Sequence, residues 1–222
     1  NVWISKIMAL NKLKFNSLNV TPAASEGIRF NSSANGLETA SAGGNVVKIA
    51  ATTASSSASV SFTSGIDSTY KEYIFTFNNI HPQTDEKNFV FNLSTDSGSN
   101  YNVTKTTTFF RAQHLEGGNA EVFEYVTGDD LAQSTSDARI SNLCGNDSDQ
   151  CVSGFLHLFE PSSTTFVKHF ISNVNSCFTN SEASVNLYMA GYGNTTSAVD
   201  AVTFKFDSGN IDSGTITMYG VT

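Results

Sequence analysis

Charged residues are scarce in this chain of 222 residues: Asp, Glu, Lys and Arg together make up only 14% of it, against about 25% in an ordinary soluble domain. Ser, Thr and Asn fill the polar positions instead, and their side chains compete with helix formation through local hydrogen bonds. The apolar residues include 17 Phe and 7 Tyr but a single Trp. Aromatic and β-branched residues favour strands, so the composition predicts an all-β protein.

Basic residues are the scarcer charged type, 12 against 20 acidic residues, which gives a net charge of −8 and a pI near 4.8. A nucleic-acid partner needs a basic stripe on the protein, and the sequence contains none, so we expect no such partner. Residues 1–44 carry four basic and two acidic side chains, a net of +2, while residues 45–222 carry 8 and 18, a net of −10. Two interpretations stay open: a basic segment that docks onto an acidic partner, and a chance fluctuation.

Long apolar runs are also missing. The longest uncharged stretch lies between Lys48 and Asp67 and is rich in Ser and Thr, so it falls far short of the roughly 20 apolar residues that cross a bilayer. We therefore expect no membrane insertion. The first ten residues lack the apolar run of a secretory signal, and the segment from Met8 resembles an ordinary protein start.

Cysteine is limited to three residues, Cys144, Cys151 and Cys177. Cys144 and Cys151 are close enough in the sequence to bridge a loop, and Cys177 would then be left over. Without a secretory signal, reduced thiols are the favoured default. The sequence leaves both states of Cys144 and Cys151 open.

The chain divides into two parts, residues 1–44 and residues 45–222. The first part shows little sustained periodicity and collects turn formers, so we expect an extended N-terminal arm that anchors the protein and orders only against a partner. In the second part, short runs alternate as strands do; Tyr73, Phe75 and Phe77, for example, share one face at a period of two. The expected strands cover residues 46–49, 58–62, 70–78, 89–93, 106–112, 120–127, 138–143, 152–159, 165–174, 185–192, 201–207 and 213–219. Because no helical stretch separates them, they predict an antiparallel, jelly-roll-like β-sandwich, with one short helical turn at Asp129–Ser136.

Short catalytic motifs are absent: the sequence has no G-x-S-x-G nucleophile elbow, no phosphate-binding loop and no paired cysteine motif of a zinc site. The histidines are the best remaining candidates for an active site. A hairpin centred on Ser163 would set His157 directly opposite His169, close enough for the two rings to share a metal. No third ligand is indicated, and the favoured alternative is two histidines hydrogen-bonded within a β-face.

An acidic segment follows His114. A glycosidase needs two carboxylates at a fixed separation, and nothing in the sequence picks out such a pair, so solvated acids are the favoured interpretation. The segment contains Glu116, Glu121, Glu124, Asp129 and Asp130.

Two further groups of residues are candidates for ligand binding, one for Ca²⁺ and one for sugars. Residues 146–150 alternate oxygen ligands suited to Ca²⁺ but lack the Gly and the distal Glu of an EF-hand loop, so we favour a polar turn. Four tyrosines are candidates for stacking on sugars, although tyrosine is also common in strands. They are Tyr101, Tyr125, Tyr188 and Tyr192.

Three stretches carry a resemblance to a known family. Residues 66–82 contain the pattern D-x-x-Y-x-x-Y-x-F-x-x-x-x-I-x-P, residues 154–163 are GFLHLFEPSS, and residues 204–220 are FKFDSGNIDSGTITMYG. In this order they resemble a widespread family of tailed-bacteriophage virion structural proteins, often tail-fibre-like. The likeness covers roughly residues 60–222 and does not extend to the arm. It implies a β-sandwich displayed on a particle, commonly as an oligomer, with no catalytic residues to carry over.

The sequence therefore predicts a non-enzymatic phage virion structural protein on the virion surface, assembled in the host cytoplasm. The first hypothesis is a tail fibre or tail-tip adhesin that attaches to a host-surface glycan or receptor. The second is a capsid decoration or head-fibre protein anchored by its arm, and the third is a carbohydrate-binding lectin or a polysaccharide-active enzyme. Expected partners are other virion proteins, through the arm, and further copies of the chain, with a trimer suggested by analogy. We expect no catalytic, cofactor-binding or metal residues.

Overall fold

The computed structural model describes residues 26–222, except 31–32, 34, 42–44, 119–120 and 179–182. Within these ranges the regular elements are all strands, and every strand pairing is antiparallel. The chain forms two compact units, Asn1–Asn45 and Val46–Thr222, and this boundary lies one residue beyond the one expected. No helix of the described residues is long and apolar enough to span a membrane.

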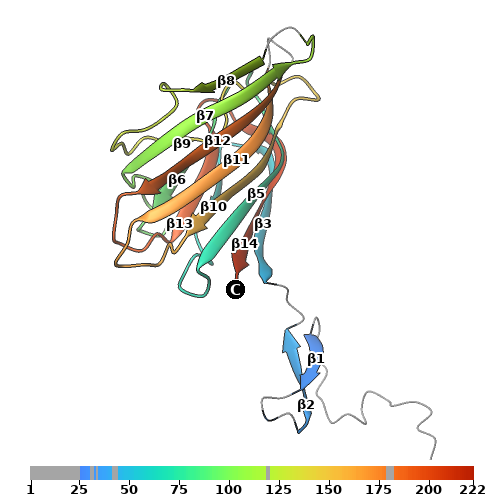
Figure 1. The fold of residues 1–222 in the computed structure, drawn as a ribbon, viewed down its shortest axis with the longest axis vertical. Coiled ribbons are helices and arrows are strands. Elements are labelled where there is room, and N and C mark those ends of the chain that lie inside the picture. The colour runs from blue at the N-terminus through green and yellow to red at the C-terminus, as the bar shows by residue number, and fades with distance from the viewer. Residues whose placement is uncertain (1–25, 31–32, 34, 42–44, 119–120, 179–182) are drawn as a thin grey trace, which may run out of the picture. The chain divides into compact units, whose positions relative to one another are not determined.

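The second unit is the predicted β-sandwich, in which a large sheet packs against a smaller one (Figure 1). The large sheet has eight strands in the order β3 (Val46–Ser57), β14 (Ile211–Val221), β5 (Glu72–Pro82), β10 (Val152–Phe159), β11 (Lys168–Phe178), β12 (Ala183–Gly193), β7 (Lys105–Leu115) and β8 (Glu121–Tyr125). The small sheet has four, in the order β4 (Val60–Phe62), β13 (Ala201–Phe206), β6 (Phe89–Ser94) and β9 (Ala138–Arg139).

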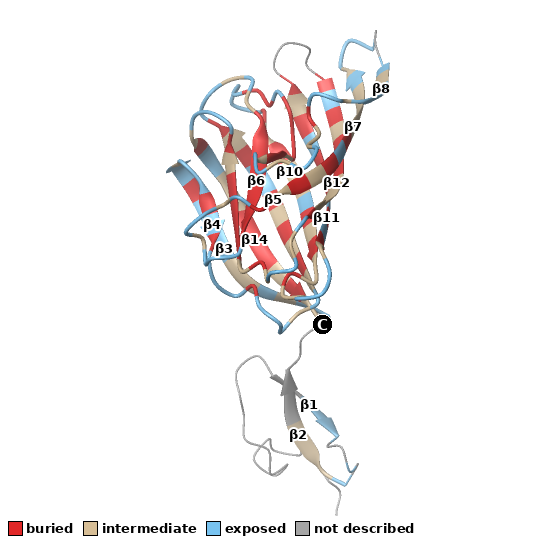
Figure 2. Ribbon diagram, turned by 90° about the vertical axis from the view of Figure 1, so that its left-hand side faces the viewer, coloured by how far each residue is buried: buried red, intermediate tan, exposed pale blue. Residues whose placement is uncertain are grey.

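The buried residues lie between the two sheets (Figure 2), and phenylalanine is the most frequent residue type among them. Phe75 and Phe77 of the large sheet contact Phe204 of the small sheet, each with ring centroids 5.2 Å apart. Tyr73 is buried beside them, which confirms that these alternate positions of β5 share one face. Aromatic pairs at such distances stabilise a core beyond their burial alone.

The strand predictions located most elements but not their ends. β5 continues through Asn79 and His81 to Pro82, where turn chemistry was expected to stop it at Asn78. β3 begins at Val46, where a strand was expected to open, and runs on to Ser57, because pairing with β14 holds this Ser- and Thr-rich segment in a ladder. The short helical turn expected at Asp129–Ser136 was wrong: the segment consists of turns and bends.

The first unit contains a hairpin within the arm. β1 (Glu26–Phe30) pairs with β2 (Leu37–Ser41), and Arg29 forms an ion pair with Glu38 at 2.9 Å. Over Glu26–Ser41 the chain therefore folds back, where an extended arm was expected, and residues 1–25 of that arm lie outside the described residues. The turn formers of the arm supply the reversal, since Asn35 and the glycine after it lie in the connection between the strands.

Two lysines lie buried at the end of the large sheet, Lys105 on β7 and Lys168 on β11. The Lys105 ammonium donates to Asn92 Oδ1 at 2.5 Å and to the Val103 carbonyl at 2.8 Å. Desolvation lowers the pKa of Lys105 to about 8 and also lowers the pKa of Lys168. Both lysines pair in register with Gly193 of β12, so they lie on either side of this glycine on the two neighbouring strands.

Candidate functional site

The outer face of the large sheet, which points away from the small sheet, carries an unusual set of side chains. On β11, Phe170 and Val174 are buried in the core, whereas His169 and Ile171 alternate with them and are exposed. The same alternation on the neighbouring strands defines the outer face. Its residues on β10, β11, β12 and β7 are Ser153, Phe155, His157, Phe159, His169, Ile171, Asn173, Asn175, Ser184, Asn186, Tyr188, Ala190, Tyr192, Thr106, Thr108, Phe110, Ala112 and His114.

An aromatic band crosses this face. Phe110 of β7 stacks on Tyr188 of β12, with ring centroids 4.8 Å apart and planes 7° apart. Phe123 of β8 lies on the other side of Phe110 at 5.9 Å and is 77% exposed. Across β11, Phe155 occupies the same row, since Tyr188 pairs with Asn173 and Asn173 pairs with Phe155. We call Phe110, Phe123, Phe155 and Tyr188 the aromatic band.

Amide side chains lie along the same strands and are fixed by each other. The Asn173 amide donates to Asn186 Oδ1 at 2.8 Å, and the Asn186 amide donates to Tyr188 Oη at 2.9 Å. One row further, Asn175 donates to Ser184 Oγ at 3.0 Å. Hydrogen bonds of this kind hold the side chains in place, so the tyrosine ring of the band is oriented before any ligand arrives.

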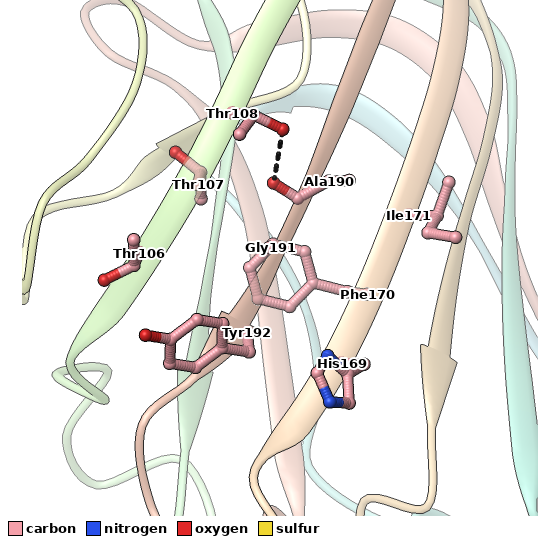
Figure 3. Close-up of a pocket in the computed structure, with 9 residues that line it drawn as sticks. All are labelled: Thr106, Thr107, Thr108, His169, Phe170, Ile171, Ala190, Gly191 and Tyr192. Atoms are coloured by element: carbon pink, nitrogen blue, oxygen red, sulfur yellow. Dashed lines mark hydrogen bonds between the residues drawn. The ribbon is translucent and has the colours of Figure 1, made fainter.

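A groove of about 420 Å³ opens on this face between β7, β12 and β11 (Figure 3). Gly191 lies in its middle row, between Thr107 and Phe170 in the register, and Ala190, next to it on β12, lies between Thr108 and Ile171. The small side chain of Ala190 leaves space on this face. Tyr192 and His169 form one end, with rings 6.1 Å apart. The Thr108 hydroxyl donates to the Ala190 carbonyl at 3.4 Å.

Position 191, beneath the groove, requires glycine because neighbouring atoms approach its backbone closely. A Cβ at this position would lie 2.4 Å from the carbonyl oxygen of Thr106 and 2.9 Å from the ring of Phe170. Contacts that short demand that the backbone or ring shift, so glycine lets β7, β12 and β11 pack tightly at the groove.

The expected opposition of His157 and His169 was wrong. His157 pairs with Ile171, and His169 pairs with Tyr192 on the next strand. The β10–β11 hairpin is therefore centred one residue later than Ser163, because Leu158 pairs with Phe170. Nδ1 of His157 contacts Oε1 of Glu72. This histidine is bonded within the β-face, as the favoured alternative had it, and the two rings do not form a shared metal site.

Several carboxylates of the acidic segment have partners. Glu124 pairs with Arg111 at 2.6 Å, and Glu121 lies 3.6 Å from Nε2 of His114. Asp130 accepts a 2.5 Å hydrogen bond from Tyr125, which raises the pKa of the tyrosine.

Asp129 in the same segment is buried and structural. It pairs with Arg139 and accepts from the Asn142 amide at 2.7 Å. Removing one partner of a buried ion pair leaves an uncompensated charge. Asp129 thus stabilises the loops beside the small sheet.

The oxygen-rich segment 146–150 forms a turn, in which the backbone N–H of Gln150 donates to the Asp147 carbonyl at 2.9 Å. A second hollow of about 250 Å³ lies beside it, lined in part by Asn79, His81 and Asp149. Nε2 of His81 contacts the Asp147 carbonyl at 3.1 Å. Throughout the described part of the chain, no three His, Cys, Asp or Glu side chains gather as a metal site would require.

The remaining candidates have different environments. Tyr188 and Tyr192 lie on the outer face, and Tyr125 is exposed on β8, whereas the Tyr101 hydroxyl is buried in a loop. Cys144 is buried, and this burial raises the pKa of its thiol to about 12. It forms no disulfide with Cys151.

Comparison with known proteins gave no match: no family model, no curated protein and no solved structure corresponds to this chain. The chemistry of the candidate site therefore rests on its own geometry. An exposed, pre-oriented aromatic and amide surface with a shallow groove is suited to binding by stacking and apolar contact.

Proposed function

We propose that this protein is a non-enzymatic virion surface protein of a tailed bacteriophage that attaches to the host surface through the outer face of its large sheet. The observation that carries the proposal is the aromatic band. Large aromatic side chains on a soluble protein are normally buried, and an exposed cluster of them marks an interaction site. The resemblance of residues 60–222 to tail-fibre-like proteins supports the same function.

We also propose that the N-terminal arm, residues 1–44, tethers the protein to the phage particle. An isolated two-stranded hairpin is marginally stable in water, yet β1 and β2 form one. Ile28 and Phe30, two residues apart on one face of β1, are 42% and 72% exposed. Such a face is stabilised by packing against a partner, and the proposed partner is another virion protein.

Rebinding to stripped particles tests the tether. Particles that lack this protein are mixed with the full chain or with residues 45–222, and the bound fraction is measured by copurification. We expect only the full chain to bind, and imaging then locates it on the tail or the capsid. Equal binding of both would contradict the tether and would make the sandwich itself the docking surface.

A capsid decoration or head-fibre protein anchored by the arm is the second candidate. Imaging of rebound particles separates it from the tail adhesin, because density on the head favours decoration. A free lectin or a polysaccharide-active enzyme predicts different solution behaviour. Saturable sugar affinity without particle binding supports the lectin, and release of reducing ends from a polysaccharide supports the enzyme.

A further inference from the structure

The four edges of the sandwich are protected unequally. An edge strand presents backbone N–H and C=O groups that can pair with another chain, and natural proteins shield such edges by shortness, charge or proline. Three edge strands here are short: β8 has 5 residues, β4 has 3 and β9 has 2. β8 also carries exposed Glu121 and Glu124. These three edges resist pairing.

The fourth edge strand, β3, has none of these protections along most of its length. It has 12 residues and contains no proline and a single charge, Lys48. A bulge interrupts its pairing with β14 near Lys48, but from Ala50 to Ser55 the ladder is continuous. Within the described residues β14 is the strand that pairs with β3, so the other edge of β3 offers backbone donors and acceptors from Ala50 to Ala54. Beyond Ala54, the Ser55 N–H donates to Ser57 Oγ at 3.2 Å, and the Ser56 carbonyl accepts from the Asn210 side chain at 3.0 Å.

We propose that β3 pairs antiparallel with β3 of a second copy of this chain, around a two-fold axis at Thr52. The pairing joins two large sheets into one continuous sheet and is independent of what the outer face binds. Residues that pair across the axis sum to 104, so Ala50 faces Ala54, Ala51 faces Thr53, and Thr52 faces its own counterpart.

A second copy fits this edge for two reasons. Antiparallel strands of identical sequence satisfy each other's backbone groups, which is the self-complementarity that a two-fold interface requires. The distribution of charge also permits this pairing. Residues 45–222 carry a net charge of −10, so two copies repel each other through most of their surfaces, but the only charged residue of β3 is Lys48. The proposed register covers Ala50–Ala54, where β3 has no charged residue, so no like charges face each other there. Small Ala and Thr pairs bring the backbones together without steric conflict.

Charge complementation at Thr52 tests the proposal. Thr52 is exposed, so we expect the variants Thr52→Lys and Thr52→Asp to fold. In a dimer of either variant, two like charges face each other across the two-fold axis, and like charges directly opposite destabilise a strand pair. Molar mass of the full chain is measured by light scattering during size-exclusion chromatography. We expect an assembly with an even number of chains, half that mass for each variant, and restoration of the original mass when the two variants are mixed.

Thr164, an exposed residue of the β10–β11 loop, supplies the matched control, since Thr164→Lys and Thr164→Asp should leave the mass unchanged. A monomeric or trimeric wild-type chain overturns the proposal, as does a mass unaffected by either Thr52 variant. Failure of the mixture to restore the mass overturns it too, because the edge is then covered by something other than a second β3. If a variant misfolds, hydrogen exchange of the wild-type chain decides. Alternate amides of Ala50–Ala54 bond to β14 and stay protected at any concentration. Protection of the other amides that falls on dilution supports the pairing, and exchange of those amides that does not change on dilution overturns it.

Discussion

Replacing the buried Lys105 by methionine should remove a specific pH dependence of stability. Lys105 has a pKa of about 8 in the folded protein, against about 10.4 in an unfolded chain. Below pH 8 both states hold the proton, and the cost of the buried charge is fully present. Between these values the unfolded chain binds more protons, so the free energy of unfolding rises with pH.

The size of this rise follows from the shift. Each unit of pKa corresponds to about 1.36 kcal/mol, so a shift of about 2.4 units is worth about 3 kcal/mol in full. About 2.5 kcal/mol of this increase falls between pH 8 and pH 10.5, because the folded state has already lost half of its proton at pH 8 and the unfolded state still holds half of its proton near pH 10.4. Lys105→Met lacks the titrating amine and loses this increase. At neutral pH the variant also leaves the Val103 carbonyl without the Lys105 ammonium, which costs about 1–3 kcal/mol, whereas Asn92 Oδ1 still accepts from the Leu93 backbone N–H at 2.9 Å. The test is therefore the slope with pH and not the stability at one pH.

Urea unfolding across this pH range measures the slope. Lys71→Met is the matched control, because Lys71 is exposed and its removal should leave the pH dependence of the wild-type protein. We expect the wild-type and Lys71→Met curves to rise together and the Lys105→Met curve to rise less. Parallel curves for wild type and Lys105→Met would refute the account of the buried lysine.

Three further predictions concern the core, a thiol and a buried ion pair. Phe204→Ala should lower the free energy of unfolding by about 4 kcal/mol, because the Phe204 ring contacts five other phenylalanine rings. Urea unfolding measures the loss, and a loss as small as that caused by Phe166→Ala, at an exposed position, would contradict this packing. In maleimide labelling of the native protein at pH 8, the half-buried Cys151 should react well before Cys144, whose pKa burial raises to about 12; equal rates would show that Cys144 is accessible. Asp129→Asn should cost about 3 kcal/mol by leaving Arg139 without its carboxylate, and a melting temperature unchanged from the wild type would refute the role of this pair.

The sequence predicted the features that depend on local alternation. Tyr73, Phe75 and Phe77 were expected on one face, and all three are buried, because a period of two is a property of the strand itself. The outer face was harder to predict. Phe109 and Phe110 are neighbours of the same type, yet Phe109 is buried and Phe110 belongs to the aromatic band; sequence alone does not say which face meets the second sheet.

Two features could not be predicted from the sequence: the register of the β10–β11 hairpin and the burial of two lysines. A one-residue change in the centre of the β10–β11 hairpin moved His157 from opposite His169 to opposite Ile171, and that centre depends on how the loop packs. Lysines usually lie in solvent, and nothing local in the sequence marks Lys105 and Lys168 as buried. Carbonyl and amide oxygens from neighbouring loops and strands accept hydrogen bonds from their ammonium groups.

The most direct test of the proposed attachment surface is competition for host cells. Purified protein is incubated with cells that the phage infects, and the rate of phage adsorption is then measured. The account predicts that wild-type protein slows adsorption, that Tyr188→Ser within the aromatic band loses this effect, and that Phe166→Ser, an exposed aromatic residue of a loop, keeps it. Equal competition by Tyr188→Ser and wild type, or no competition by the wild-type protein, would contradict the account.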